Sequence, residues 1–237
     1  MSETQNYVRS SFSDGATKLA VSILQTAKEP DKIFQHGRYF AIPGGITLQK
    51  ECFERVLTSA KVQDVLSNRP SQTWPELEQM GAMPKGSLGC CLQQRMEMLG
   101  LCFLPEPELP EPESDEAFFI SRSVRLHEIH HTVLGLPITV AGEAAASAFY
   151  ASTGSMPFDI SVLASWMLRG SYEPSERRLI WDGISFGIAV GQRVPELFSP
   201  RWEEGWERSI IDWQNELGIT ELLKTSPFQE YLATSYA

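Results

Sequence analysis

The residue pattern with the clearest chemical meaning is the stretch 127–131 (HEIHH), followed twelve residues later by Glu143. His127 and His131 are four residues apart, so on a helix they project from one face and can share one metal ion. Glu128 lies about 100° further around such a helix and can reach the edge of the same site. The Gly-Leu-Pro turn that follows would fold the chain back and bring Glu143, about one turn into a second helix, opposite the histidines. Two imidazoles with one or two carboxylates suit zinc or another divalent first-row metal.

The same residues also fit roles other than a metal site of this kind. The histidines could be surface or core residues that hydrogen bonds satisfy, and His130, which points elsewhere on the helix, is expected to have a structural or surface role. Residues 127–131 also match H-E-x-x-H, the signature of zinc metallopeptidases. In that case Glu128 would be the general base and Glu143 the third ligand. Such peptidases usually carry a sheet before the motif helix, and the sequence gives almost no strand signal there.

The elements that would position these residues have helical spacing. We expect helices over 7–28, 31–40, 47–66 (one broken helix or two), 87–99, about 117–134, about 139–150, 158–168, 175–192 and 202–217. The best strand candidate, Arg38 to Ile42, is weak. The sequence therefore predicts an all-α fold, a single helical domain over residues 1–237, with the metal motif on an antiparallel helix pair. The segment 105–116 (PEPELPEPESDE) should be an extended linker, with its last residues capping the next helix.

Composition and charge exclude several classes of protein. The chain has 237 residues, 42% of them hydrophobic, which describes a globular protein with an ample core. A net charge of −10 argues against a nucleic-acid-binding protein, and we expect no nucleic-acid partner. No apolar run approaches the roughly 20 residues that span a bilayer. The four cysteines have neither zinc-finger spacing nor a disulfide framework, so we expect reduced thiols and a cytoplasmic location.

The combined pattern H-[D/E]-x-x-H, eleven residues, E is much more specific than its parts. His127, Glu128, His131 and Glu143 satisfy this pattern. The chain also contains three accompanying sequence segments: HHTVLGLPITVAGE, MPKGSLG (83–89) and RWEEGWERSIIDWQNELGI (201–219). With them the chain resembles the Coq4 family of ubiquinone biosynthesis from its first helix to about Ile219. The family usually has Asp at the position of Glu128 and an acidic residue where this chain has Arg125. These departures indicate a divergent member, for which we expect a bacterial source.

The resemblance implies a metal-binding, prenyl-lipid-binding protein of quinone biosynthesis, acting in oxidative decarboxylation (hydroxylation at ring carbon one) of a polyprenylated benzoate. It implies a divalent metal, zinc first, with magnesium, iron or manganese as alternatives. The partners it implies are the prenylated quinone precursor, other quinone-biosynthesis enzymes and a membrane surface, so the protein would lie peripheral to the inner membrane; it also makes a homodimer plausible. Two other functions stay open: a non-catalytic scaffold that presents prenyl lipid to partner enzymes, and the zinc peptidase.

Two further features are candidates for substrate binding. Arg122 matches a basic residue of the family motif and would pair with the anionic head group, the alternative being a surface ion pair. Gly183, Gly187 and Gly191 recur every four residues and form one stripe of a helix. Since each helical glycine costs about 1 kcal/mol relative to Ala, the stripe needs a reason: either another helix approaches closely, or a trough accommodates the lipid chain.

Overall fold

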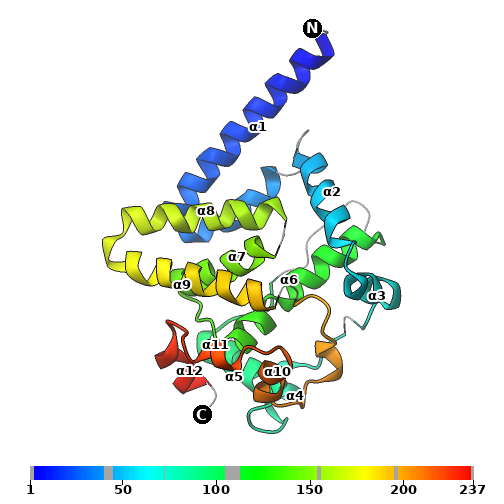
Figure 1. Ribbon diagram of the computed structural model, residues 1–237, viewed down its shortest axis with the longest axis vertical. Coiled ribbons are helices and arrows are strands. Elements are labelled where there is room, and N and C mark those ends of the chain that lie inside the picture. Colours follow the sequence, from blue (N-terminus) through cyan, green and yellow to red (C-terminus); the bar gives the residue numbers. More distant parts are fainter. Residues whose placement is uncertain are drawn as a thin grey trace. The chain divides into compact units, whose positions relative to one another are not determined.

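The structure, a computed structural model, is helical wherever it describes regular secondary structure (Figure 1). The described residues are 3–39, 45–71, 73–104, 113–153, 156–194 and 197–235. Within these ranges the β-type pairing is limited to an isolated bridge between Ser87 and Ser209. The all-α prediction is therefore confirmed.

The helices follow one another along the chain with short connections. They are α1 (Glu3–Lys28), the 3-10 helix η1 (Pro30–Tyr39), α2 (Gly45–Val56), α3 (Ala60–Asn68), α4 (Leu77–Gly81), α5 (Leu88–Leu99), α6 (Asp115–Leu134), α7 (Val140–Ser152), α8 (Pro157–Tyr172), α9 (Pro174–Arg193), the 3-10 helix η2 (Trp202–Glu204), α10 (Ile210–Glu216), α11 (Thr220–Leu223) and α12 (Gln229–Ser235). None of the described helices has the length and apolar character that crossing a membrane requires.

The chain divides into two compact units, and the first comprises Met1–Leu57 and Thr139–Gln192. Its central element is α8, against which α1, η1, α2 and α7 pack. Helix α7 buries a face of small residues, including Ala144, Ala145 and Ala148. The indole of Trp166 in α8 is buried as well, and its Nε1 donates to Ser147 Oγ at 3.1 Å.

The second unit comprises Thr58–Ile138 and Arg193–Ala237, and α6 is its central element. Helices α3, α5 and α10 pack against α6, while α4 and α12 pack against α5. Leu126, Ile129 and Val133 recur at three and four residues and are fully buried, so they form the apolar face that holds α6 in place. The prediction of one domain over the whole chain stays a prediction.

Most predicted helices are present, but the one expected over 202–217 is wrong as a single element. The chain forms η2, a turn, and then α10. The carbonyls of Trp206 and Arg208 accept from the amides of Gly89 and Leu88, each at 2.8 Å, and these tertiary bonds take backbone groups that a continuous helix would use. Ser209 then starts α10, since its Oγ accepts from Asp212 N at 3.2 Å.

Two other expectations lie partly outside the described residues. Arg38 and Tyr39 of the weak strand candidate belong to η1, and residues 40–42 are not described. Of the predicted linker over 105–116, residues 105–112 are not described. Its last part does cap the next helix, because Ser114 Oγ accepts from Ala117 N at 3.1 Å and α6 begins at Asp115.

Candidate metal centre

Helix α6 is long and well delimited, and this fixes the register of its histidines. It spans 20 residues from its Ser114 cap to Gly135, whose φ of 63° ends it in the left-handed conformation that glycine adopts without strain. His127 and His131 therefore lie one turn apart on the same face, with their ring centroids 4.5 Å apart. The sequence-based expectation that the two imidazoles share a face is met.

The start of α7 places Glu143. Thr139 caps this helix, with its Oγ accepting from Gly142 N at 3.3 Å, and Glu143 belongs to the first turn. The partial positive charge at a helix N-terminus favours a carboxylate at this position. Only the residues from Gly135 to Thr139 separate α6 from α7, so the connection keeps Glu143 near the end of α6.

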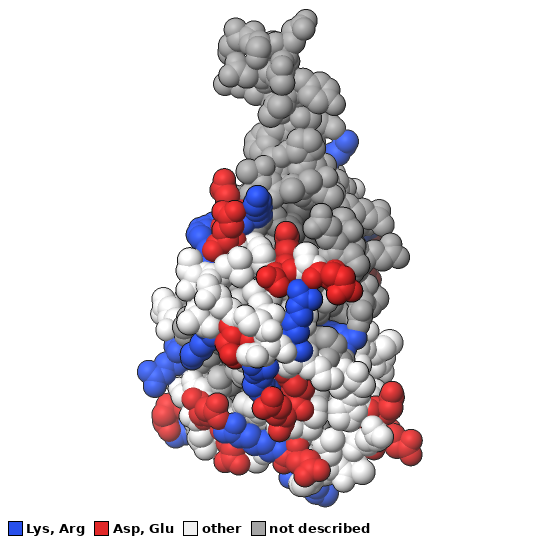
Figure 2. All heavy atoms as spheres, turned by 90° about the vertical axis from the view of Figure 1, so that its right-hand side faces the viewer, with Lys and Arg blue, Asp and Glu red and all other residues white. Residues whose placement is uncertain are grey.

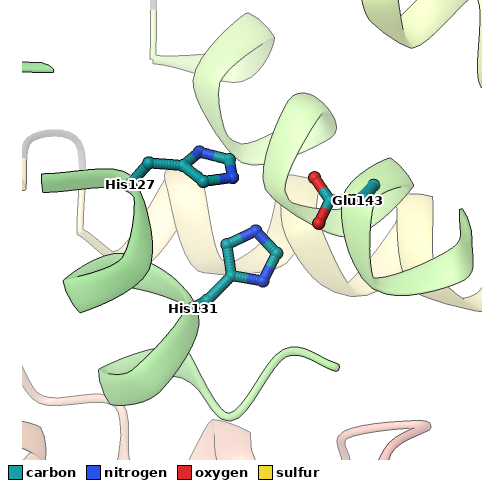
Figure 3. Close-up of side chains that lie close together, drawn as sticks. All are labelled: His127, His131 and Glu143. Carbon is teal, nitrogen blue, oxygen red and sulfur yellow. The ribbon is translucent and has the colours of Figure 1, made fainter. Parts of the chain in front are cut away.

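These three residues form a group that can hold a metal ion (Figure 3). His127, His131 and Glu143 each offer one ligand atom, and these atoms all lie within 4.8 Å of one another. His131 is buried, while His127 and Glu143 are half-buried. Bond lengths of about 2.0 to 2.2 Å place the ligands of one zinc ion roughly 3 to 4 Å apart. Small side-chain rotations would therefore suffice for the three residues to coordinate a metal, with a position left for water or substrate.

The hydrogen bond that His131 makes also suits a ligand. Its Nδ1 lies 3.2 Å from the carbonyl oxygen of Leu136, and since a carbonyl only accepts, Nδ1 carries the proton. In the neutral form of the ring the lone pair is then on Nε2. A backbone carbonyl that fixes the tautomer through the other ring nitrogen is the usual support of a metal-binding histidine.

The neighbouring His130 has the structural role that was one of the two expected for it. It is buried, and its Nε2 donates to the carbonyl of Leu197 at 3.2 Å. Burial lowers the pKa of His130 to about 3, outweighing the hydrogen bond to Leu197, and the positively charged forms of His127, His131 and Arg122 act in the same direction. The ring is therefore neutral at physiological pH.

Glu128, which was predicted to be a ligand, lies outside the group of three. It is 7% exposed, and its Oε2 lies 3.5 Å from Nε of Arg95 in α5. Glu128 follows His127 directly on the helix, so its side chain leaves α6 in another direction. The structure thus brings together three of the four predicted ligands and places the fourth in an ion pair.

Arg122 is fully buried, so a surface ion pair, the alternative role expected for it, is wrong. Its Nη1 and Nη2 both donate to Glu203 Oε2 at 3.2 Å, Nη2 donates to the carbonyl of Pro200 at 3.0 Å, and Nε to that of Phe198 at 3.2 Å. Burial lowers the pKa of the guanidinium, and Glu203 opposes this shift. All three nitrogens of Arg122 are used within the protein, so its predicted contact with a substrate head group gains no support.

Two glycines of the α9 stripe lie against α7. A Cβ on Gly187 would collide with the carbonyl oxygen of Ala145, and one on Gly191 would collide with Ser152 Oγ. Gly183 is buried in the same helix. The close approach of another helix therefore accounts for Gly187 and Gly191, while the role of the three glycines in substrate binding stays a prediction.

A pocket of about 740 Å³ lies elsewhere in the second unit, between α3, η2 and α10. Its charged lining residues largely pair with one another: Arg201 binds Asp64 at 2.8 Å and Arg208 binds Glu216 at 2.5 Å. None of the predicted ligands lines it. Figure 2 likewise shows basic side chains interspersed with acidic ones on one face of the described chain, rather than gathered in a broad basic area.

Sequence reasoning missed Arg95, which contacts both Glu128 and the turn after α6. A signal for it exists: Leu88, Leu92 and Met96 recur at helical spacing and are fully buried, and Arg95 lies on the face that they define. A charged residue on the apolar face of a helix needs a buried partner. The spacing predicts that need, but it cannot name a partner 33 residues away.

Comparison with known proteins finds one family. The model of the family described as coenzyme Q (ubiquinone) biosynthesis protein Coq4 matches residues 16–222. The mitochondrial ubiquinone biosynthesis protein coq4 of Botryotinia fuckeliana is 26% identical over 175 residues, which are 72% of this chain and 61% of that protein. The mitochondrial COQ4 homolog of Homo sapiens is 28% identical over 162 residues, covering 66% and 60% of the two chains. The chain thus spans about three fifths of the length of these curated relatives.

A solved structure shares the fold. The crystal structure of a protein from Nostoc punctiforme, described as belonging to ubiquinone biosynthesis, superposes with a TM-score of 0.73 and covers 88% of this chain and 98% of its own. At 19% sequence identity this likeness establishes the fold alone.

Proposed function

Because the chain belongs to the Coq4 family of coenzyme Q biosynthesis proteins, we propose that it acts in ubiquinone biosynthesis and holds a divalent metal ion, zinc first, with His127, His131 and Glu143. The observation that carries the metal site is the group of three ligand atoms within 4.8 Å. The fixed tautomer of His131 supports it. Two imidazoles and one carboxylate are a ligand set found in catalytic zinc sites that keep a position open.

The proposed substrate is a polyprenylated benzoate, and the proposed reaction replaces its ring carboxylate by hydroxyl. The carboxylate leaves as carbon dioxide and the same ring carbon gains a hydroxyl group. This is a two-electron oxidation, for which dioxygen from outside the chain would be the oxidant. When bound, the metal would act as a Lewis acid toward the carboxylate or phenolate oxygen of the ring. The chain's own residues would orient that head group, since His131 hydrogen-bonds to the Leu136 carbonyl and Glu143 stands in the first turn of α7.

The two alternative functions differ in their support. A scaffold that presents prenyl lipid to other biosynthetic enzymes, at the membrane surface or as a homodimer, would use the same family fold without turnover. The zinc peptidase gains no support, because the described residues before α6 form no strand that could align a peptide. Its general base would be Glu128, whose carboxylate lies beside Arg95.

Metal analysis of purified variants tests the site. His127→Ala and His131→Ala should each lose the divalent metal that the wild-type protein retains. The matched control is His36→Gln, which replaces a buried histidine of the first unit whose ring nitrogens lie 2.9 Å from Ser161 Oγ and 3.0 Å from Thr26 Oγ1. Full metal occupancy in both alanine variants would refute the site.

Lipid extraction followed by mass spectrometry tests the substrate class. We expect a prenylated aromatic compound to copurify with the wild-type protein. A protein that is free of lipid and also refuses added prenylated benzoate would contradict the proposal. Conversion of that compound to the hydroxylated product, with release of carbon dioxide, would separate the enzyme from the scaffold.

A further inference from the structure

Arg95 is a buried charge in the middle of α5 that the proposed metal site does not itself use. Its side chain is 3% exposed. Nη1 donates to the Leu136 carbonyl at 2.8 Å and to the hydroxyl of Tyr231 in α12, and the guanidinium lies 5.8 Å from the centre of the Tyr231 ring. Because an arginine stays protonated in proteins, this interior position must accommodate a full positive charge.

The Leu136 carbonyl connects Arg95 to the proposed ligand His131. The same oxygen accepts from Arg95 Nη1 at 2.8 Å and lies 3.2 Å from Nδ1 of His131. A carbonyl oxygen has two lone pairs and can accept both bonds. Arg95 therefore fixes the atom that selects the tautomer of His131 and sets the direction of its ring.

Glu128 supplies the negative charge that Arg95 needs. Their closest atoms are 3.5 Å apart, and both side chains are almost fully buried, at 3% and 10% exposure. The backbone carbonyl of Glu128 also accepts from Thr132 Oγ1 at 2.7 Å. A buried guanidinium without a carboxylate would be strongly unfavourable, so drawing Glu128 toward a metal would leave Arg95 uncompensated.

We propose that Glu128 is not a metal ligand in this protein. Instead, Arg95 and Glu128 form a positioning pair that holds the turn after α6 and, through the Leu136 carbonyl, orients His131 toward the metal. Tyr231 extends the pair to α12, so the C-terminal helix helps to fix the ligand. This inference rests on the proposed metal site and specifies which of the acidic residues belongs to it.

Cobalt absorption spectroscopy distinguishes a ligand from a positioning residue. At saturating Co²⁺, Glu128→Gln should keep the visible bands of the wild-type protein, because the ligand set is unchanged, and should only need more Co²⁺ to saturate. His131→Ala supplies the spectrum of a lost ligand. If Glu128→Gln shifts the bands as His131→Ala does, Glu128 is a ligand and the inference is overturned.

A double-mutant cycle in metal affinity tests whether the two residues act as a pair. Arg95→Met and Glu128→Gln should each weaken Zn²⁺ binding, measured by competition with a chromogenic chelator, by about 10- to 100-fold, as residues that orient ligands typically do. The double variant should bind no more weakly than the weaker single variant. Losses that multiply would show that Glu128 acts independently of Arg95 and would contradict the pair.

Tyr231→Phe covers the case in which Arg95→Met fails to fold, because it removes only the hydroxyl group that accepts from Arg95. It should weaken Zn²⁺ binding by less than Arg95→Met and leave the Co²⁺ bands in place; an unchanged Zn²⁺ affinity would exclude α12 from the network.

The wild-type protein separates the two proposals. If it binds neither Zn²⁺ nor Co²⁺, the metal site itself fails, whereas binding that only His127→Ala and His131→Ala disturb leaves the site intact and refutes the positioning pair.

Discussion

Two adjacent histidines of α6 hold two different loops, each together with an arginine. On one side, His130 donates to the Leu197 carbonyl, and Arg122 donates to the carbonyls of Phe198 and Pro200. Arg122 also makes two bonds to one oxygen of Glu203. Every nitrogen of this arginine is engaged, and the histidine is neutral and buried.

On the other side, His131 and Arg95 share a single carbonyl, that of Leu136. The carboxylate beside Arg95 lies at 3.5 Å, which is long for a hydrogen bond, and Nη2 of Arg95 is buried without a hydrogen-bond partner among the described residues. On the side of Arg122 every arginine nitrogen has a partner, although Glu203 Oε1 is buried without one among the described residues, and this side has a structural role. The side of Arg95, which has fewer hydrogen bonds, adjoins the proposed metal ligands, as expected where binding geometry is favoured over stability.

The largest expected effect would come from breaking the structural side. Arg122→Met leaves the Glu203 carboxylate buried without its counter-charge and should cost about 3 to 5 kcal/mol of unfolding free energy. Urea unfolding in the presence of a chelator measures it. The double variant Arg122→Met/Glu203→Gln should recover much of that loss, and the folded protein should bind Zn²⁺ as the wild-type protein does. A tenfold weaker Zn²⁺ affinity would show that the two sides are not separate.

Two glycines that end helices offer a matched test of the other loop. Gly135 has φ of 63°, and a Cβ there would collide with Leu232 Cδ2, whereas Gly100 has φ of 62° and nothing within 4 Å. Gly100→Ala should cost only the strain of the left-handed conformation, about 1 to 2 kcal/mol. Gly135→Ala should cost about 1 to 3 kcal/mol more from overpacking and should also weaken Zn²⁺ binding, because it displaces the Leu136 carbonyl.

The same urea unfolding and chelator competition measure both glycine variants. Adding Leu232→Ala to Gly135→Ala should return most of the overpacking cost, since it removes the side chain that the new methyl group meets. Equal losses of stability in Gly100→Ala and Gly135→Ala would mean that Leu232 of α12 does not pack tightly against Gly135.

The local parts of this arrangement could be predicted from the sequence. The spacing of His127 and His131, the Ser114 cap and the glycine at the end of α6 depend on residues within a few positions of one another. Counting along the turn sufficed to place Glu143 near them. The interactions that decide the roles of Arg122 and Arg95 could not be predicted from the sequence, because their carboxylate partners lie 81 and 33 residues away along the chain. The break between η2 and α10 was missed for the same reason, since the amides of Leu88 and Gly89 at the start of α5 cause it.

The pH dependence of stability sharpens the contrast between the two histidines. The folded-state pKa of His130 is lowered to about 3, chiefly by burial, from an ordinary value of 6.5. A lowered histidine pKa contributes stability above the unfolded-state value, and this stability is lost as pH falls below 6.5 toward 3. The expected slope is about 1.4 kcal/mol per pH unit for one proton.

His130→Gln keeps an amide donor for the Leu197 carbonyl. It should reduce the slope of stability against pH by up to about 1.4 kcal/mol per pH unit, the contribution of one proton. Urea unfolding of the metal-free protein between pH 7.5 and 5 measures it. His36→Gln serves as a comparison in the first unit, because burial also lowers the pKa of His36 and this variant should remove that histidine's own contribution to the slope. An undiminished slope in His130→Gln would mean that another group causes the acid sensitivity.

The smallest expected effect is a change in thiol reactivity within α5. Cys91 is buried, and burial, with a smaller contribution from Cys90, raises its pKa to about 11, whereas Cys102 is exposed. A maleimide reagent should therefore label Cys102 first and Cys91 only when α5 opens, since the thiolate is the reactive form.

Arg95→Met removes the hydrogen bonds and the ion pair that Arg95 makes from α5. It should speed Cys91 labelling severalfold, read by mass spectrometry of tryptic peptides. Arg122→Met, compared at a urea concentration that matches global stability, should not; equal acceleration would show that α5 opens only when the whole protein unfolds, and Arg95 would then not secure it locally.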